Sequence, residues 1–377
     1  MSASPGLAVA ASGCAPISHQ TPDGLIVREV TLRDFRSYSR LELRLEPGVV
    51  LVTGPNGAGK TNLLEALHVG TQGFSPRARN DAQLVRLGMT AGRVHLRGSN
   101  GQVPFESDIA LSSCDARRAK LNGAALRSAE QLRLELRALV FTPDRLAVVK
   151  GAPATRRAYL DRTMGRLFPA RATVSVEYAA AVGQRNAALR RLAANASSRE
   201  ALTPWTQAVL SLGEVLVEAR YRTVDLLRPV FASRAERLGL SGATLTYDGE
   251  APTAAELERR LERDLERGLT GAGPHLHDLR LQAGDRDLRN FGSQGEQRVG
   301  ILALVLAEAE ILQQRTGVAP LVLLDDVLSE LDDERRRALA EMVASSGQTV
   351  LTATSAAALP AEPSQLLAVS PGEIREG

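Results

Sequence analysis

The sequence predicts an α/β nucleotide-binding core into which a second, mostly helical domain is inserted. An apolar run at residues 49–52 is followed by a glycine-rich loop and then by a helical pattern, the order strand, loop, helix. A second apolar run, Leu321–Leu324, ends in two aspartates. Helix-forming residues dominate from about 128 to 265. Because strand patterns lie on both sides of this helical stretch, we expect the two outer parts to form one α/β unit.

The glycine-rich loop has the pattern of a phosphate-binding loop, Gly-x₄-Gly-Lys-Thr. Its residues are Gly54, Pro55, Asn56, Gly57, Ala58, Gly59, Lys60 and Thr61. Backbone N–H groups of such a loop, at a helix N-terminus, bind phosphates. We expect Lys60 to contact the β- and γ-phosphates of ATP, the Thr61 hydroxyl to ligate Mg²⁺, and Asn62 to lie beside the nucleotide. A helix is expected over Asn62–Leu67, with Gly70 able to end it.

Lysine usage favours this interpretation over a glycine turn with a stray lysine. Only three of the 46 basic residues are lysines, namely Lys60, Lys120 and Lys150. A compact ammonium group on a flexible stem fits between phosphates where a planar guanidinium does not. The phosphate loop therefore contains a lysine although almost all other basic residues of the chain are arginines.

Other elements follow from apolar periodicity and turn residues. Strands are expected over 25–45, within 93–126 around a turn at Asn122-Gly123, beside Gly284-Asp285, and over Thr349–Thr352 before a Ser/Ala/Pro-rich tail. A long apolar helix is expected from Val299 to about Gln314. The helices between 128 and 265 are separated by Gly and Pro residues, so no heptad pattern long enough for an extended coiled coil is present.

Length and composition set the broad class. A chain of 377 residues with 44% hydrophobic content allows two to three domains. We divide it into a disordered leader (1–24), an N-terminal head part (25–127), a helical arm (128–268) and a C-terminal head part (269–377). The leader has no positively charged start, which argues against an export signal. Two cysteines make no disulfide framework, and no apolar run reaches 18 residues, so we expect a cytoplasmic protein without a membrane span.

The positive charge is concentrated in one part of the expected arm. Residues 145–199 contain eleven basic residues and only two acidic ones, Asp161 and Glu177, a net charge of +9 in a chain of net charge +3. Such a block suggests contact with a polyanion. The alternative is an ordinary solvated helical face.

The aspartates after Leu321–Leu324 are candidates for metal binding and catalysis. A buried strand would place Asp325 at the carboxyl edge of the sheet, beside the phosphate loop, where it can hold Mg²⁺ directly or through water. Asp326 would then orient or activate a water for hydrolysis of the γ-phosphate. Taken alone this pattern is weak, because buried strands often end in Asp.

A polar segment at residues 293–298, hereafter the signature loop, stands at the head of the apolar helix. Ser293, Gly295 and Glu296 are its nucleotide-binding candidates, since a hydroxyl, a glycine and a helix N-terminus suit an anion. Helix capping by Ser293 and Glu296 is the alternative, and both can hold. Ser293 follows Thr61 by 232 residues but precedes Asp325 by only 32, the order of the signature and Walker B motifs in ABC-type ATPases. In those proteins the signature loop of one head completes the ATP site of another.

From about Leu25 onward the chain resembles the RecF family of bacterial recombinational repair proteins. The matching segments are residues 32–38, 54–66, 151–161, 184–186, 293–298 and 323–332. The resemblance implies an ABC-type head with a short helical arm that forms an ATP-dependent homodimer on DNA, at gaps or junctions and without sequence preference, and hydrolyses ATP slowly. It also implies work with RecO and RecR, help in loading RecA at gaps, and support of the SOS response.

Some positions depart from the family pattern. Gly-Pro-His-Arg-Asp-Asp is here Gly273–Asp278 with Leu276 and His277 in place of a charged pair, which puts the contacts of that segment in doubt. No Q-loop glutamine is evident, Thr352-Ala353-Thr354 replaces a switch histidine, and the second acid is Asp326 rather than Glu. These features favour a slow switch over a motor. The alternatives are a transport ATPase, whose head is more compact before the signature, and a chromosome protein, which needs long coiled-coil arms.

Overall fold

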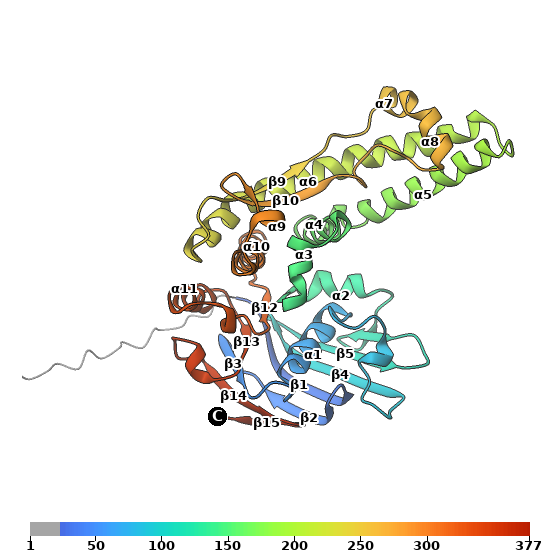
Figure 1. Cartoon of the computed structure of the whole chain (residues 1–377). Helices are drawn as coiled ribbons and strands as arrows, with labels where there is room; N and C mark the ends of the chain where they lie inside the picture. Colours follow the sequence, from blue (N-terminus) through green and yellow to red (C-terminus); the bar gives the residue numbers. More distant parts are fainter. Residues whose placement is uncertain (1–22) are drawn as a thin grey trace, which may run out of the picture.

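The structure is a computed structural model that describes residues 23–377. Apart from its last two residues, the leader expected at 1–24 lies outside the described residues. In Figure 1 two sheets and the helices around them form a head in the lower half of the picture, and long helices form an arm that extends from it to the upper right. Segments from both ends of the sequence build the head, in agreement with the expected insertion.

One sheet of the head consists mainly of parallel strands in the order β15-β14-β3-β13-β12-β8. Their bounds are β3 (Val49–Thr53), β8 (Ala138–Phe141), β12 (Leu321–Leu324), β13 (Thr349–Ala353), β14 (Gln365–Ser370) and β15 (Glu373–Glu376). Only β15 runs antiparallel to its neighbour. The strands β8 and β12 are buried along their whole length, which explains why they are continuous apolar runs rather than alternating ones.

The second sheet of the head is antiparallel, in the order β2-β1-β4-β5-β6-β7. Its strands are β1 (Leu25–Phe35), β2 (Tyr38–Arg44), β4 (Ala91–Asn100), β5 (Val103–Ser112), β6 (Arg118–Leu121) and β7 (Ala124–Ala125). Burial alternates along β4 and β5, so one face is solvated and the other packs on helix α1 (Lys60–Gln72). Because α1 also contacts β8, β12 and β13, it lies between the two sheets, and one apolar core joins all three layers.

Helix α1 continues past Gly70, so the expected stop at that residue is wrong. The helix ends at Gln72 and is closed by Gly73 in the left-handed conformation, at φ 70°. A Cβ at Gly70 would lie 2.3 Å from the Leu96 Cδ1 atom on β4. Glycine is therefore required there for close packing of the helix on the sheet, and not for termination.

The arm is an antiparallel helix pair supported by a small sheet. Its long helices α5 (Val174–Ala193) and α6 (Thr203–Arg237) pack on one another, and α6 packs on the three-stranded sheet β11-β10-β9. The remaining α-helices are α2 (Ala129–Glu135), α3 (Ala147–Lys150), α4 (Pro153–Leu167), α7 (Ala254–Arg259), α8 (Leu261–Arg267), α9 (Leu288–Phe291), α10 (Gln294–Thr316) and α11 (Asp333–Ala344). The arm strands are β9 (Ala243–Asp248), β10 (Asp278–Ala283) and β11 (Arg286–Asp287), and the 3₁₀ turns are 81–83, 143–146, 169–171, 199–202, 328–330 and 356–358. No long coiled coil is present in the described chain.

Four short strands differ from the sequence expectation. β8 lies in the range we assigned to the arm but pairs with β12 in the head sheet. Conversely, β10 lies in the range assigned to the head but pairs with β9 of the arm. The tail after β13 is not irregular, since β14 adds to β3 and β15 closes the edge. A four-residue apolar run gives no period that separates strand from helix, which explains why β8 was missed.

Four of the eleven basic residues of 145–199 form salt bridges with acidic residues outside this block, namely Arg156, Arg166, Arg185 and Arg199. Arg156 forms a salt bridge with Asp278 at 2.6 Å, and Arg185 forms one with the buried Asp264 at 3.0 Å. Two bonds of 2.7 and 2.9 Å join Arg220 to Asp161, one of the two acids in the basic block. The net charge of this block therefore overstates the number of cations that are free to bind a partner.

The segment that departs from the family pattern is part of the same internal network. The Arg157 guanidinium donates to the His277 carbonyl at 2.9 Å, and the Tyr247 hydroxyl lies 2.8 Å from the His277 Nδ1 atom. His275 is held between the Tyr178 hydroxyl and the Thr270 carbonyl, each at 2.9 Å. Within residues 23–377 no cluster of three or more His, Cys, Asp or Glu residues could hold a metal ion. These histidines are therefore structural.

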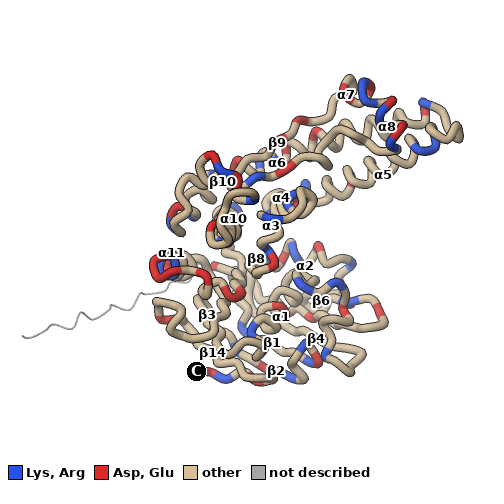
Figure 2. The backbone as a smooth tube through the Cα atoms, viewed as in Figure 1, with Lys and Arg blue, Asp and Glu red and all other residues tan. Residues whose placement is uncertain are grey.

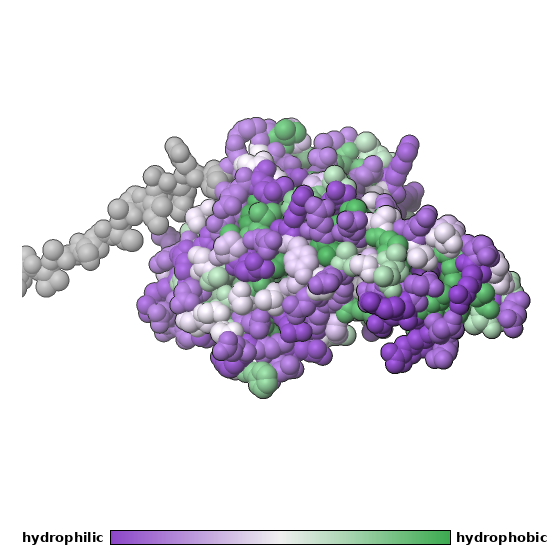
Figure 3. All heavy atoms as spheres, turned by 90° about the horizontal axis from the view of Figure 1, so that it is seen from above, coloured by the Kyte–Doolittle hydropathy of each residue, from purple (hydrophilic) through white to green (hydrophobic). Residues whose placement is uncertain are grey.

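No helix of the described chain combines the length and the apolar character needed to cross a membrane. The face seen in Figure 3 is mostly hydrophilic, and its hydrophobic residues form scattered small groups rather than one broad surface.

Candidate functional site

The predicted site residues meet at the carboxyl edge of the parallel sheet. Strands β3, β12 and β13 run in the same direction, so their C-terminal ends lie together. The phosphate loop (54–61) follows β3, Asp325 follows β12, and Thr352 lies near the end of β13. This edge is where open α/β sheets bind their ligands.

Two glycines of the phosphate loop are fixed by close approach of other elements. Gly54 has φ 148°, and a Cβ there would lie 2.3 Å from the Val369 carbonyl oxygen on β14. Gly59 has φ 119°, and its Cβ would lie 2.9 Å from the Tyr38 hydroxyl, which itself donates to the Gly59 carbonyl at 3.1 Å. The edge strand β14 and the start of β2 thus hold the loop from two sides. Pro55, Asn56 and Gly57 remain exposed, whereas Ala58 is buried.

Lys60 is the first residue of α1, and its ammonium group lies over the loop. Its Nζ atom donates to the carbonyls of Gly54 at 2.7 Å and Pro55 at 3.0 Å. Burial lowers the pKa of Lys60, while the carboxylates of Asp326 and Asp325 act in the opposite direction. The ammonium therefore lies at the mouth of the loop, near both acids that follow β12.

Thr61 and Asp325 form the pair expected for a metal site. The Thr61 hydroxyl donates to Asp325 Oδ1 at 3.0 Å, and the Thr352 hydroxyl donates to the same oxygen at 2.8 Å. Burial raises the pKa of Asp325, and the hydrogen bonds from Thr352 and Thr61 counteract this effect. A hydroxyl oxygen and a carboxylate oxygen on adjacent elements fit the oxygen ligands that Mg²⁺ prefers.

Asp326 differs from its neighbour Asp325 in backbone conformation and in exposure to solvent. Its backbone is in the left-handed region at φ 49°, and its side chain is exposed. The Asp326 N–H donates to the Thr352 hydroxyl at 2.8 Å, so Thr352 connects both aspartates. A positive φ in a residue other than glycine is uncommon and clusters at functional sites. This turn separates the two carboxylates, leaving one buried beside Thr61 and one open toward the loop.

A polar network supports the loop from the β1–β2 turn. The Arg36 guanidinium makes two bonds of 2.8 Å to the buried Glu65 of α1. Asn62 donates from its amide to the Ser37 hydroxyl at 2.9 Å. These bonds tie the turn to the first half of α1. The side-chain amide of Asn62 therefore holds the β1–β2 turn against the helix.

The signature loop caps helix α10. The Glu296 N–H donates to the Ser293 hydroxyl at 3.2 Å and the Ser293 N–H donates to the Glu296 carboxylate at 2.7 Å, which completes a capping box. Among residues 23–377 no hydrogen bond or salt bridge joins this loop to residues 54–62. Gly295 has open space around its Cα, the nearest atom to an added Cβ being the Ser293 hydroxyl at 4.0 Å. Ser293 and Gln294 are exposed, so the loop is accessible to a second molecule.

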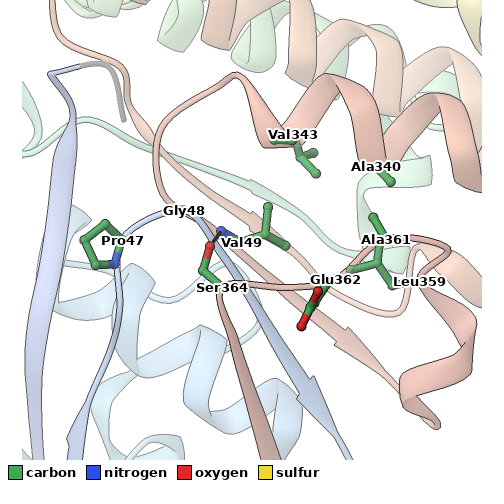
Figure 4. Close-up of a pocket in the computed structure, with 10 residues that line it drawn as sticks. Pro47, Gly48, Val49, Ala340, Val343, Leu359, Ala361, Glu362 and Ser364 are labelled. Carbon is green, nitrogen blue, oxygen red and sulfur yellow. Dashed lines mark hydrogen bonds between the residues drawn. The ribbon is translucent and has the colours of Figure 1, made fainter. Parts of the chain in front are cut away.

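One hollow of the molecule is unrelated to this edge. Pro47, Gly48, Val343, Leu359 and Ser364 line a space of about 60 Å³ at the start of β3 (Figure 4). There the Ser364 hydroxyl accepts from the Val49 N–H at 3.2 Å. The phosphate loop leaves the other end of the same strand, so this hollow lies at the opposite edge of the sheet from the site.

Three residues of the site were not predicted in their observed roles. The sequence singled out Thr352 only because it stands where a switch histidine is expected. In the structure it connects both aspartates. Tyr38 holds the phosphate loop, and Arg298 joins the signature loop to Glu330 at 2.5 Å. A threonine at the end of a buried strand is the signal by which Thr352 could have been found. The other two contacts depend on tertiary packing.

Comparisons with known proteins agree on one family. The family model for the RecF/RecN/SMC N terminal domain matches residues 26–372. The chain is 37% identical over 347 residues to the DNA replication and repair protein RecF of Acidothermus cellulolyticus, which covers 87% of this chain and 93% of that protein. It is 35% identical over 345 residues to the RecF of Heliobacterium modesticaldum, covering 87% of this chain and 92% of the relative. A solved structure of the recombination mediator protein RecF with ATP has a TM-score of 0.83 at 24% identity, covering 96% of this chain and 100% of the other.

Proposed function

The chain belongs to the RecF family of DNA replication and repair proteins, and we propose that it is an ATP-gated DNA clamp. In this proposal ATP joins two copies on DNA, and slow hydrolysis releases them. The protein would assist RecA loading at single-strand gaps and support the SOS response, together with RecR and RecO. DNA would be held through its phosphates, without sequence preference, at gapped duplex or at junctions.

The observation that carries the proposal is the contact between Thr61 and Asp325, 264 residues apart in the sequence and 3.0 Å apart in space. Together with Lys60 they supply an ammonium, a hydroxyl and a carboxylate at the mouth of a phosphate loop. Lys60 and the loop amides from Gly54 to Thr61 would bind the β- and γ-phosphates of ATP. Thr61 and Asp325 would hold Mg²⁺, which neutralises phosphate charge when bound. Asp326 would orient the attacking water.

The second half of the site would come from another copy of the chain. The signature loop is exposed and makes no bond to the phosphate loop of its own chain, within the described residues. The Ser293 hydroxyl and the backbone N–H groups at the N-terminus of α10, including that of Gly295, would bind the γ-phosphate on the partner's phosphate loop, while the Glu296 carboxylate would hold Ser293 in place. A nucleotide between the two copies then acts as the contact that holds them together.

The arm distinguishes this proposal from the alternatives. Its longest helix, α6, spans 35 residues and packs on α10, on β9 and on the 20-residue helix α5, so the antiparallel helix pair of the arm is short. This supports a compact clamp over a chromosome protein with extended arms. We retain the division into head (25–127 and 269–377) and arm (128–268) as a proposal, with β8 assigned to the head and β9–β11 to the arm. We further propose that the protein acts in the cytoplasm.

Oligomeric state tests the clamp. Light scattering of the wild type is expected to give a monomer without nucleotide and a dimer with ATP and Mg²⁺. Lys60→Ala should remain monomeric, because its loop loses the charge that binds the terminal phosphates. Asp326→Asn should form a dimer that persists, because binding is kept while hydrolysis is slowed. An oligomer that is the same with and without ATP would contradict the proposal.

DNA retention tests the substrate. Binding of gapped and plain duplex is measured with and without ATP over a range of salt concentrations. We expect ATP to increase retention and salt to reduce it. If ATP has no effect on retention at any salt concentration, the clamp mechanism fails.

A further inference from the structure

We propose that four arginines at the junction of head and arm form a phosphate-binding site. Arg133 comes from α2, Arg145 from the 3₁₀ turn at 143–146, and Arg162 and Arg166 from α4. We call these residues the arginine cluster. Figure 2 shows basic residues around α2, α3 and α4, where the arm meets the head. The inference rests on the proposed DNA-binding function for its source of phosphate, but not for the site itself.

Among residues 23–377, three of the four arginines have no acidic partner, and only Arg166 forms a salt bridge, with Glu308. Ten of the 21 arginines between residues 128 and 268 form a salt bridge, as Arg156 and Arg185 illustrate. In contrast, no salt bridge or side-chain hydrogen bond within the described chain involves Arg133, Arg145 or Arg162. Arg162 and Arg166 lie one helical turn apart on α4, a spacing at which like charges destabilise a helix. Such an arrangement is unfavourable unless an anion binds to it.

A buried carboxylate, that of Glu308, lies among these arginines. Glu308 of α10 is fully buried and accepts from the Tyr159 hydroxyl at 2.9 Å, the Thr163 hydroxyl at 3.2 Å and Arg166 Nε at 2.6 Å. Three donors already use its oxygens. The Arg166 Nη2 atom is buried and has no partner in the part of the chain that the structure describes. One carboxylate thus cannot neutralise four guanidinium groups, and a donor remains unused.

Two of the guanidinium groups are held in place by aromatic rings while their N–H donors stay free of partners in the described chain. Arg133 stacks on Phe74 with its Cζ atom 5.6 Å from the ring centroid, and Arg145 stacks on Tyr159 at 5.8 Å. Stacking uses the face of a guanidinium and leaves its N–H groups at the edge for a phosphate. Parts of Arg162 and Arg145 are exposed at the surface, although their guanidinium groups lie among other atoms of the chain, so a ligand can reach their outer edges.

The charges are close enough to affect one another. Burial lowers the pKa of Arg145 to about 10; Tyr159 and Glu308 oppose this shift, and Arg166 and Arg162 add to it. Burial followed by Arg166 also lowers the pKa of Arg162. For Arg133 burial lowers the pKa, Glu130 opposes the shift and Arg166 adds to it. All of them remain charged at neutral pH, so their mutual repulsion persists there and a bound phosphate would relieve it.

The shared chemistry is a phosphate group, which can come from the DNA backbone or from a free anion. The test compares the wild type with Arg145→Gln/Arg162→Gln and with the matched control Arg28→Gln/Arg337→Gln, which removes the same charge from two exposed arginines elsewhere on the head. Arg162→Gln alone is included because its side chain is exposed and its loss leaves the packing on Tyr159 intact.

Two readouts are measured on the full-length protein. Inorganic phosphate replaces chloride at constant ionic strength, and we expect the melting temperature to rise by about 1–2 °C more in the wild type and the control than in the cluster variants, whose phosphate loop is unchanged. For duplex DNA, the slope of log affinity against log salt should fall by about 1.8 in the double cluster variant, or 0.9 per lost phosphate contact.

The outcomes distinguish failure of the phosphate-binding site from failure of the proposed DNA-binding function. Loss of both effects in the cluster variants assigns the site to DNA phosphates. Loss of the phosphate effect alone assigns it to a free phosphate anion. If the cluster variants respond like the control in both readouts, the site is refuted although DNA binding stands. If the wild type does not bind DNA, the proposed function fails, and the phosphate readout alone decides on the site.

Discussion

Thr352 offers a direct test of how the two aspartates are held. The substitution Thr352→Val keeps the shape of the side chain and removes its hydroxyl. Two bonds of 2.8 Å are lost, one donated to Asp325 and one accepted from the Asp326 N–H. A hydrogen bond to a charged group contributes about 1.5–3 kcal/mol, and an unpaired buried donor costs about 1–3 kcal/mol. Since Asp326 is partly accessible to water, we expect the free energy of unfolding to fall by about 2–4 kcal/mol in total.

The same strand supplies the control. Thr349 also lies on β13 and is fully buried, but its hydroxyl has no hydrogen-bond partner among the described residues. Thr349→Val should therefore leave the free energy of unfolding unchanged or raise it, because a buried unsatisfied polar group is removed. Urea unfolding of both variants measures the difference. Equal effects of the two substitutions would refute the hydrogen-bonding role of Thr352.

The substitution should also change the chemistry of the site. Burial raises the pKa of Asp325, and the hydrogen bond from Thr352 is the main opposing influence. In Thr352→Val this pKa should rise further, so Mg²⁺-dependent ATP binding should be lost at a higher pH on acidification than in the wild type. A titration of nucleotide binding against pH measures the shift. An unchanged midpoint would mean that Asp325 does not depend on Thr352.

Two further predictions concern stability. Gly70→Ala should destabilise the protein by about 1–3 kcal/mol, because the added methyl group would overpack against Leu96. Gly183→Ala, in open space on α5, should stabilise it by about 0.5–1 kcal/mol. Urea unfolding measures both changes, and changes of the same sign would contradict the packing explanation. Burial lowers the pKa of His277 to about 4 and also lowers that of His275. Between this pKa and the ordinary value of 6.5 the folded state binds fewer protons than the unfolded state. The contribution of the neutral histidine to the free energy of unfolding is therefore complete above pH 6.5 and is lost as the pH falls toward about 4. The substitution His277→Gln should flatten this pH dependence.

The phosphate loop and the aspartates could be predicted because each is a contiguous pattern next to a buried strand. Thr61 and Asp325 needed only the rule that parallel strands end at one edge of a sheet. Thr352 was not assigned its role because the sequence does not say which strand lies beside β12. That neighbour, β13, is fixed by tertiary pairing.

The fold shows the same limit. Long periodic elements such as α10 were predicted, although it begins at Gln294 rather than at Val299. The four-residue strand β8 was missed because a short apolar run suits a helix equally well. The basic block was overestimated as a surface, since Arg156 and Asp278 form their salt bridge across 122 residues. Such pairs cannot be assigned without the packing of the arm.

The central claim is that one ATP site is shared by two copies of the chain. Mixing Lys60→Ala with Gly295→Asp tests it most directly, since Gly295 has room for a side chain and its change spares the capping box. Each variant alone should fail to form the ATP-dependent dimer or to hydrolyse ATP. In the mixture, heterodimers keep one intact site, so about a quarter of the wild-type hydrolysis is expected to return. A mixture no more active than the sum of its parts would contradict the shared site.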